Sequence, residues 1–408
     1  MAVAAVLLAL AYLCAAALAA ALPAVTRVGS WLPLHLALAG GASTAIAGVM
    51  PFFSAAFAIA QPVSARIRWA SVAAVALGAL GVAAGYATAV LPLAVSGGIA
   101  YMAGMALTGF ATLAPARHGL GPRGGVITLG YLLALLMVLT GALVGSLFMA
   151  GWQPVLETWA SLKPAHAVLN LVGFVSLVIA TTLLHFFPTV IGARILRTPS
   201  AYVTVVGLAS GAALLSGGFA LRSDGLVRGG ATAVAIGAVA LAAYAWQAWR
   251  TRALWTGDRG WHLYAMGGLV SAIAWFEVGV LMTSARLLVS GADPAATNAD
   301  ILAGPLVVGW VALAVLASAT HLVPAIGPGD PAAHARQRRL LGQGAALRLA
   351  AANVGIAGIS VGLPLHLDWL TLTAMLLAGG SLFATAALLV AATVSGLRSA
   401  RASGNLVE

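Results

Sequence analysis

Residues 166–190 read HAVLNLVGFVSLVIATTLLHFFPTV, an apolar run without a single Asp, Glu, Lys or Arg. A helix needs about 20 such residues to cross the hydrocarbon core of a bilayer. A histidine lies near each end of the run, and Pro188 follows the second one, His185, by three residues. Further along the chain, His321 and Pro324 repeat this spacing. The pattern is typical of membrane-spanning helices that carry ionisable side chains.

The composition points to the same class of protein. The 408-residue chain is 62% hydrophobic and 7% charged, whereas soluble domains carry about 25% charged residues. The single cysteine, Cys14, excludes disulfide frameworks and thiolate metal sites. No long hydrophilic segment interrupts the sequence, and the longest loop, about 325–345, is too short to fold alone. We therefore expect one polytopic transmembrane domain over residues 1–408.

Twelve apolar segments are long enough to span a membrane, which predicts an all-α membrane protein. The expected spans cover residues 3–22, 32–60, 69–87, 89–114, 126–150, 165–190, 201–221, 229–249, 261–285, 301–324, 346–365 and 370–396.

The basic residues predict the orientation. With both termini in the cytoplasm, 15 of the 20 Lys and Arg residues fall on the cytoplasmic side and 5 on the outer side. Such a bias is the positive-inside pattern of membrane proteins. It accounts for the net charge of +11 without a nucleic acid, so the expected surroundings are a lipid bilayer.

On this topology the histidines of the spans form two layers. The outer layer holds His35, His166 and His366, and the inner layer holds His185, His262 and His321. His166 and His185 are nineteen residues apart on one helix, or about 28 Å. They cannot share a metal ion, so any ligands among these histidines belong to two sites at two depths.

His166 shares a helix face with Asn170 and Gly173, at positions i+4 and i+7. This face presents an imidazole, an amide and a gap that admits either another helix or a flat macrocycle. At the other end of the same helix, Pro188 removes the backbone donor for the Leu184 carbonyl.

Pro324 does the same to the Thr320 carbonyl. Unpaired carbonyls at the negative end of a helix dipole favour a cation, a protonated imidazole or a metal beside each histidine. The alternative is a helix end whose histidine hydrogen-bonds a neighbour.

Glu277, the only carboxylate near the centre of a span, predicts a proton or cation site. Its alternative is a neutral acid that is hydrogen-bonded between helices.

Twelve spans with histidines on spans 2, 6 and 10 resemble the catalytic subunit of heme–copper oxidases and nitric oxide reductases. Residues 35–53, HLALAGGASTAIAGVMPFF, resemble span 2 of that family. Residues 166–195 are similar to segments of bacterial membrane proteins associated with copper oxidases and copper nitrite reductases. The resemblance implies heme and copper as cofactors, a redox partner or copper-oxidase subunit, and a multi-pass location in a bacterial plasma (inner) membrane.

The chain departs from the family at two places. Span 7 lacks the family's adjacent histidines, and span 10 carries only His321, at its inner end. A standard three-histidine copper centre is therefore excluded. Two sites remain as expectations: a bis-imidazole heme on His35 and His166, with Asn170 beside it, and a metal or second heme on the inner set. That inner set is His185, His262 and His321.

These observations favour a membrane redox protein that binds heme or copper and acts in respiration or nitrogen-oxide metabolism. Whether it is an enzyme stays open. The alternative function is a proton- or cation-coupled secondary transporter that uses Glu277 and the proline-broken spans. A third is a non-catalytic assembly or anchoring subunit.

Overall fold

A computed structural model of the chain describes residues 1–119, 125–254 and 257–402, which form helices with no strand among them. Twelve helical spans in this part of the chain are long and apolar enough to cross a membrane. The prediction of an all-α membrane protein with twelve spans is confirmed. The orientation of the termini stays a prediction.

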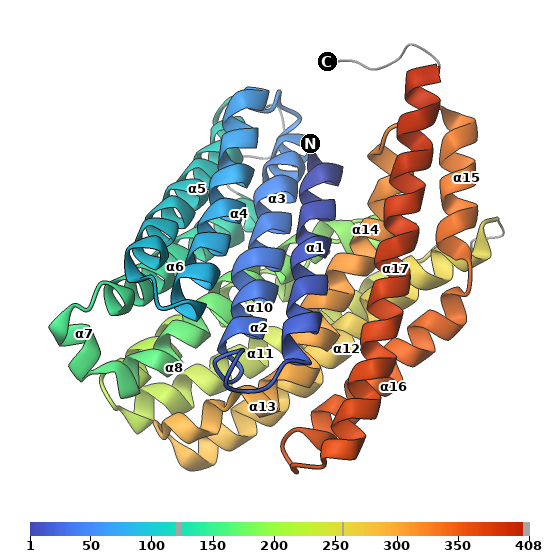
Figure 1. Cartoon of the computed structure of the whole chain (residues 1–408). Helices are drawn as coiled ribbons and strands as arrows, with labels where there is room; N and C mark the ends of the chain where they lie inside the picture. Colours follow the sequence, from blue (N-terminus) through green and yellow to red (C-terminus); the bar gives the residue numbers. More distant parts are fainter. Residues whose placement is uncertain (120–124, 255–256, 403–408) are drawn as a thin grey trace. The chain divides into compact units, whose positions relative to one another are not determined.

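The spans follow one another along the chain from α1 to α17 (Figure 1). In chain order the elements are α1 (Ala2–Ala20), α2 (Trp31–His35), η1 (Leu36–Ala42), α3 (Ser43–Ala58), α4 (Ala65–Ala87), α5 (Leu91–His118), α6 (Val126–Met149), α7 (Gln153–Glu157), α8 (Trp159–Asn170), η2 (Leu171–Ser176), α9 (Leu177–Val190), α10 (Pro199–Ala220), α11 (Asp224–Trp249), α12 (Arg259–Ser290), η3 (Pro294–Thr297), α13 (Ala299–Leu302), η4 (Ala303–Ala312), α14 (Leu313–Ile326), α15 (Pro331–Gly342), α16 (Ala345–Gly362) and α17 (Asp368–Ala402).

In the described part of the chain, three spans contain a π-helical segment, and these are spans 2, 6 and 10. Span 2 runs through α2, η1 and α3; span 6 through α8, η2 and α9; and span 10 through α13, η4 and α14. Segments η1 and η2 begin directly after His35 and Asn170. Within an α-helix, π-helical turns are rare and often mark functional sites. The spans that share this irregularity are the ones on which the sequence resemblance rests.

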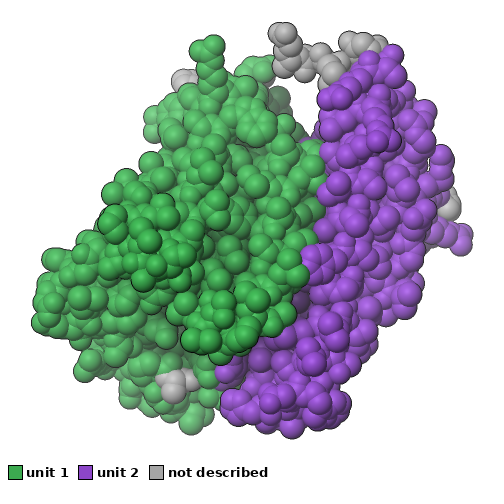
Figure 2. All heavy atoms as spheres, in the orientation of Figure 1, with its two compact units in different colours: residues 1–186, 195–247, 277–299 green, residues 187–194, 248–276, 300–408 purple. Residues whose placement is uncertain are grey.

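The described chain divides into two compact units, coloured separately in Figure 2. Unit 1 comprises Met1–Phe186, Ile195–Gln247 and Glu277–Ala299. Unit 2 comprises Phe187–Arg194, Ala248–Phe276 and Asp300–Glu408. The expectation of a single domain stays a prediction.

Glycines bring the helices of unit 1 into backbone contact. A Cβ added to Gly78 of α4 would lie 2.4 Å from the backbone nitrogen of Tyr101 in α5. A Cβ on Gly211 of α10 would lie 2.7 Å from the backbone nitrogen of Val234 in α11. In lipid, where helices gain little from hydrophobic burial, small residues at the interface allow such close van der Waals packing.

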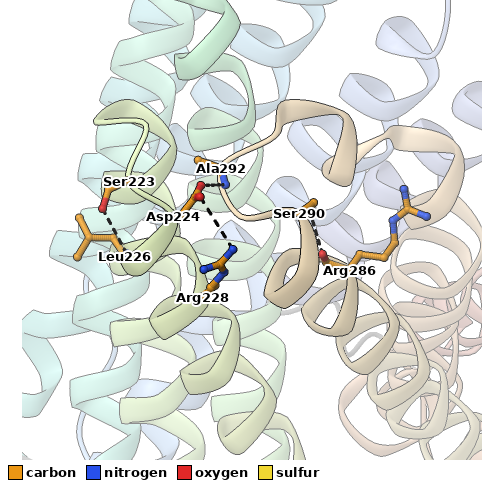
Figure 3. A network of polar contacts seen from close by, with 7 residues as sticks. All are labelled: Ser223, Asp224, Leu226, Arg228, Arg286, Ser290 and Ala292. Atoms are coloured by element: carbon orange, nitrogen blue, oxygen red, sulfur yellow. Dashed lines mark hydrogen bonds and ion pairs between the residues drawn. The ribbon is translucent and has the colours of Figure 1, made fainter.

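A polar network ties the turn after α12 to the start of α11 within unit 1 (Figure 3). The Asp224 carboxylate accepts a hydrogen bond from the Ala292 backbone nitrogen at 2.8 Å, and it lies 3.9 Å from Arg228. Gly291, directly before Ala292, adopts a φ of +62°. A Cβ on this residue would lie 2.3 Å from Asp224 Oδ1, the oxygen that accepts from Ala292. Only glycine fits this turn without displacing the aspartate.

In unit 2, the segment that the sequence analysis took for a plain loop contains helix α15. Pro331 at its first turn and Asp330 as its N-cap start this helix, and the Asp330 carboxylate accepts a hydrogen bond from the Ala333 backbone nitrogen at 2.7 Å. The buried Gln337 then joins α15 to α17 by donating to the Ala392 carbonyl at 3.2 Å. Proline and aspartate ahead of a polar stretch are a capping signal that the hydropathy reading passed over.

Candidate functional site

The first histidines of spans 2 and 6 come together within unit 1. His35 is the last residue of α2, and His166 lies in α8. Their ring centroids are 6.4 Å apart, and the two ring planes are within 15° of parallel. The structure therefore brings together two residues that lie 131 positions apart and that the sequence analysis paired as expected heme ligands.

A backbone carbonyl holds each of these rings. The Nδ1 of His35 is 2.8 Å from the Trp31 carbonyl oxygen, and the Nδ1 of His166 is 2.8 Å from the Gly141 carbonyl oxygen. Because a carbonyl only accepts hydrogen bonds, each Nδ1 carries the proton. The lone pair of each neutral imidazole then resides on Nε2, which is the nitrogen available to a metal.

Aromatic side chains surround the pair. The Trp31 ring lies 4.0 Å from the His35 ring, within 23° of parallel, and Tyr86 packs against Trp31 at 4.3 Å. On the other side, the Trp159 ring lies 6.2 Å from the His166 ring. These side chains restrict the rotation of both imidazoles.

Asn170 contacts His166 from the next helical turn. Its Nδ2 donates to the His166 carbonyl oxygen at 2.7 Å and lies 3.4 Å from Nδ1 of the ring. Helix α6 approaches closely through two glycines that the sequence analysis missed. A Cβ on Gly141 would lie 2.4 Å from Asn170 Nδ2, and one on Gly145 would lie 2.9 Å from His166 Cε1. Their i, i+4 spacing in α6 is the sequence signal for this approach.

The gap expected at Gly173 is filled by helices. A Cβ there would lie 3.0 Å from Met137 of α6 and 3.3 Å from Ala212 of α10. Of the two alternatives left open for this face, helix packing therefore applies at Gly173.

The inner set of histidines is divided between the units. His185 belongs to unit 1, where its ring lies 3.9 Å from that of Phe57. His262 and His321 belong to unit 2. Among the described residues, no three His, Cys, Asp or Glu side chains form a group that could hold a metal ion. A metal site built from the inner set stays a prediction.

In unit 2, both histidines pack against Trp261, which with Asp258 and Arg338 forms the Trp261 cluster. The Trp261 ring lies 4.5 Å from the His262 ring and 5.3 Å from the His321 ring, the latter within 10° of parallel. The Arg338 guanidinium lies 5.8 Å from the Trp261 ring and forms an ion pair with Asp258 at 2.6 Å. This cluster thus contains ring contacts and an ion pair among its interactions.

The carbonyls that the prolines were expected to leave unpaired have donors. In unit 1, the Tyr244 hydroxyl donates to the Leu184 carbonyl. In unit 2, the indole Nε1 of Trp261 donates to the Thr320 carbonyl at 2.5 Å. Helices α9 and α14 also continue through their prolines, to Val190 and Ile326. The prediction of unpaired carbonyls was wrong, because each is satisfied by an aromatic side chain from a helix distant in sequence.

Two further residues of the sequence analysis fall outside these groups. Glu277 lies in α12 within unit 1, and its buried Oε1 has no hydrogen-bond partner among the described residues. His366, which was assigned to the outer layer, is exposed in the turn between α16 and α17. Glu277 remains a candidate proton site. His366 lies in an exposed turn of unit 2 and is not part of the His35–His166 pair.

Comparisons with known proteins identify a fold. No family model matches the sequence, and neither does any curated protein. A solved structure, the cryo-electron-microscopy structure of a heme-copper terminal oxidase dimer, matches with a TM-score of 0.59 and 13% sequence identity. The match covers 100% of this chain and 84% of that chain. The chain therefore shares the membrane fold of a heme–copper terminal oxidase.

Proposed function

We propose that this chain is a membrane redox protein that holds a heme between His35 and His166. The observation that carries the proposal is the 6.4 Å separation of the two ring centroids. With a metal–imidazole nitrogen bond of about 2 Å and the ring centroid about 1 Å behind that nitrogen, two axial imidazoles place their centroids roughly 6 Å apart. The separation of the two ring centroids is close to this value, so His35 and His166 are the residues that would hold the iron.

The donor set favours heme over a bare copper ion at this position. No third His, Cys, Asp or Glu joins the pair among the described residues. A porphyrin supplies the equatorial ligands itself, so that two imidazoles complete the coordination of its iron. A copper ion in an imidazole site needs further protein donors. Copper on His185, His262 and His321 is the separate proposal that metal analysis of the purified protein tests.

The residues around the pair would orient the ligands and tune the iron. Hydrogen bonds from Nδ1 to the Trp31 and Gly141 carbonyls fix the tautomer and raise the basicity of each Nε2. The rings of Trp31 and Trp159 give the pair an aromatic surrounding, and the polarity of the surrounding is a lever on reduction potential. A bis-imidazole heme carries one electron at a time, which fits electron transfer in respiration or nitrogen-oxide metabolism.

This assignment differs from the resemblance in one respect. In the heme–copper oxidase family, spans 2 and 10 supply the low-spin heme ligands, whereas the proposed pair comes from spans 2 and 6. The fold of a heme-copper terminal oxidase supports the proposal only as a scaffold. The ligand geometry within unit 1 is the independent argument.

The test is the absorption spectrum of the purified protein. We expect a Soret band, with sharp α-bands after reduction, that is lost in His35→Ala and in His166→Ala. His366→Ala, in an exposed turn, is the matched control and should retain the full spectrum. A colourless wild-type preparation, from cells supplied with heme precursor, contradicts the proposal.

Asn170 is proposed as a positioning residue for His166. Asn170→Ala removes the amide that lies 3.4 Å from Nδ1 of the ring and leaves both ligands in place. We expect the heme to remain bound with a shifted midpoint potential, measured by redox titration. An unchanged potential with full heme content would assign Asn170 to helix packing alone.

A second function, proton- or cation-coupled transport, is favoured by the buried and unpartnered Oε1 of Glu277. An intramembrane carboxylate without a hydrogen-bond donor holds a proton or waits for a cation. In liposomes with an imposed potassium diffusion potential, wild type would acidify an internal pH dye, and Glu277→Gln would not. Equal proton movement in both proteins rejects this function.

A further inference from the structure

An open groove of about 720 Å³ runs along one face of α17 in unit 2. Its apolar part is lined by Ala387, Val390, Ala391 and Val394, which recur at the i, i+3, i+4 and i+7 positions of one helical stripe. All four are exposed. They lie in the last span, where the surrounding medium is lipid.

The groove becomes polar and basic toward the end of α17. Ser395 and Ser399 continue the stripe, and the groove is closed there by Arg398 of α17 and Arg336 of α15. From Ala387 to Arg398 the helix rises about 16 Å. One continuous groove thus has an apolar section inside the membrane span and a pair of guanidinium groups at its end.

The charge at this end is positive. Arg336 and Arg398 are both exposed, and neither forms an ion pair with a carboxylate among the described residues. The nearby Asp330 carboxylate caps α15 by accepting from the Ala333 backbone nitrogen, and its attraction to Arg336 offsets part of the positive charge, so that the two guanidinium groups still leave a net positive end. Two guanidinium groups on adjacent helices can bind one phosphate together.

We propose that this groove binds an anionic phospholipid, with the phosphate between Arg336 and Arg398 and an acyl chain along the apolar stripe from Ala387 to Val394. The order of the lining residues matches the order of a lipid, apolar chain first and anion last. The predicted orientation places this end in the cytoplasm, where the leaflet that carries anionic lipid attracts basic side chains.

Charge complementarity favours a lipid over a second copy of the chain. A two-fold contact through this face would bring the same patch of each copy together. The arginines Arg336 and Arg398 of both copies would then approach one another, with only the Asp330 carboxylate beside each Arg336 to offset them, which is unfavourable in a medium of low dielectric constant. A lipid phosphate, in contrast, neutralises them.

The experiment measures lipid retention and thermal stability of the whole protein in nanodiscs. Wild type should retain phosphatidylglycerol in native mass spectra and melt at a higher temperature in phosphatidylglycerol than in phosphatidylcholine. Arg336→Gln and Arg398→Gln should each weaken the retention of phosphatidylglycerol about five-fold. The double variant should weaken it further. Arg286→Gln, an exposed arginine of unit 1, is the matched control and should change neither quantity.

A second variant tests the acyl-chain section without altering charge. Ala391→Trp fills the groove and should reduce phosphatidylglycerol retention while the phosphate arginines stay in place. Equal stabilisation by the two lipids, or by inorganic phosphate alone, would overturn the proposal. So would a concentration-dependent dimer that Ala391→Trp disrupts, because the groove would then be an interface between copies.

Discussion

The His35–His166 pair and the Trp261 cluster use the same components in opposite ways. At the pair, backbone carbonyls accept from the two imidazoles and hold them, so that each Nε2 keeps a lone pair. At the cluster, the indole of Trp261 donates to the Thr320 carbonyl that Pro324 deprives of its helical donor. The first arrangement orients side chains for a ligand, and the second satisfies the backbone.

The comparison explains why a histidine beside a proline is weaker evidence for a site than it looks. A backbone carbonyl without a hydrogen-bond donor is unfavourable in a bilayer, so the fold supplies a donor from a neighbouring helix. A histidine whose Nδ1 donates to a carbonyl keeps the lone pair of Nε2 available for a metal. The predictions below separate these two uses of a carbonyl.

The largest effect is expected on bound heme. A His35→Ala/His166→Ala double variant should contain no heme, whereas a His262→Ala/His321→Ala double variant should contain as much as wild type. The reason is that the rings of the first pair have the separation expected for two imidazoles on one iron, whereas the rings of the second pair pack against Trp261. The pyridine hemochrome assay measures the heme content per protein in both double variants. Loss of heme in the His262→Ala/His321→Ala variant would contradict the assignment of the heme to His35 and His166.

A smaller effect is expected on stability at the Trp261 cluster. Trp261→Phe leaves the Thr320 carbonyl without its donor and should lower the free energy of unfolding by about 1 kcal/mol. In a Pro324→Ala background, the introduced alanine restores a helical N–H for that carbonyl, so the same substitution should cost less. Unfolding in a denaturing detergent measures this double-mutant cycle.

Trp246→Phe, at a tryptophan of α11 that is 63% exposed, controls for the loss of ring area. An equal cost of Trp261→Phe with and without Pro324 would mean that ring packing against His321, rather than the carbonyl, accounts for the effect.

The matching position in unit 1 should behave in the same way. Tyr244→Phe removes only the hydroxyl that donates to the Leu184 carbonyl, so the expected destabilisation is again about 1 kcal/mol. Replacing Pro188 by alanine should reduce it, since the backbone then supplies the donor. A penalty that persists in the Pro188→Ala background would show that the hydroxyl acts on another group.

The smallest effect concerns a helix start, where a side chain holds a backbone N–H. The hydrogen bond from the Ala333 amide holds the pKa of the Asp330 carboxyl below its ordinary value. The cap of α15 is therefore fully formed above about pH 4 and weakens as the pH falls through that lowered pKa. Hydrogen exchange at residues 331–342, corrected for intrinsic rates, should accelerate in that range.

Asp330→Asn keeps an N-capping oxygen without a titrating group. Its exchange at α15 should show no such acceleration. If the variant and wild type respond alike to acid, the cap does not depend on the charge of Asp330.

Several features of this protein follow from particular residues in the sequence. Uncharged apolar runs such as residues 166–190 determine the spans, because no other regular structure satisfies the backbone of a single segment in lipid. The depth of His35 and His166 follows from their places near span starts. Asn170 at i+4 from His166 follows from helical periodicity, and its contact with His166 is present.

Other features required the packed structure. That the rings of His35 and His166 lie 6.4 Å apart depends on how spans 2 and 6 are packed in unit 1. The donors Tyr244 and Trp261 are 60 and 59 residues from the carbonyls that they satisfy, so no local pattern joins them. Helix α15 was missed because its signal is a cap and not hydropathy.

The sequence by itself determined the number of spans and the place of each ionisable residue along its span, since these depend on local composition and on the helical rise. The tertiary structure alone decided which histidines become neighbours and which backbone carbonyls obtain donors. These depend on the rotation of each helix and on the glycines, such as Gly141 and Gly145, that set how closely two helices approach. Such quantities belong to pairs of helices, and a single sequence contains no periodicity that encodes them.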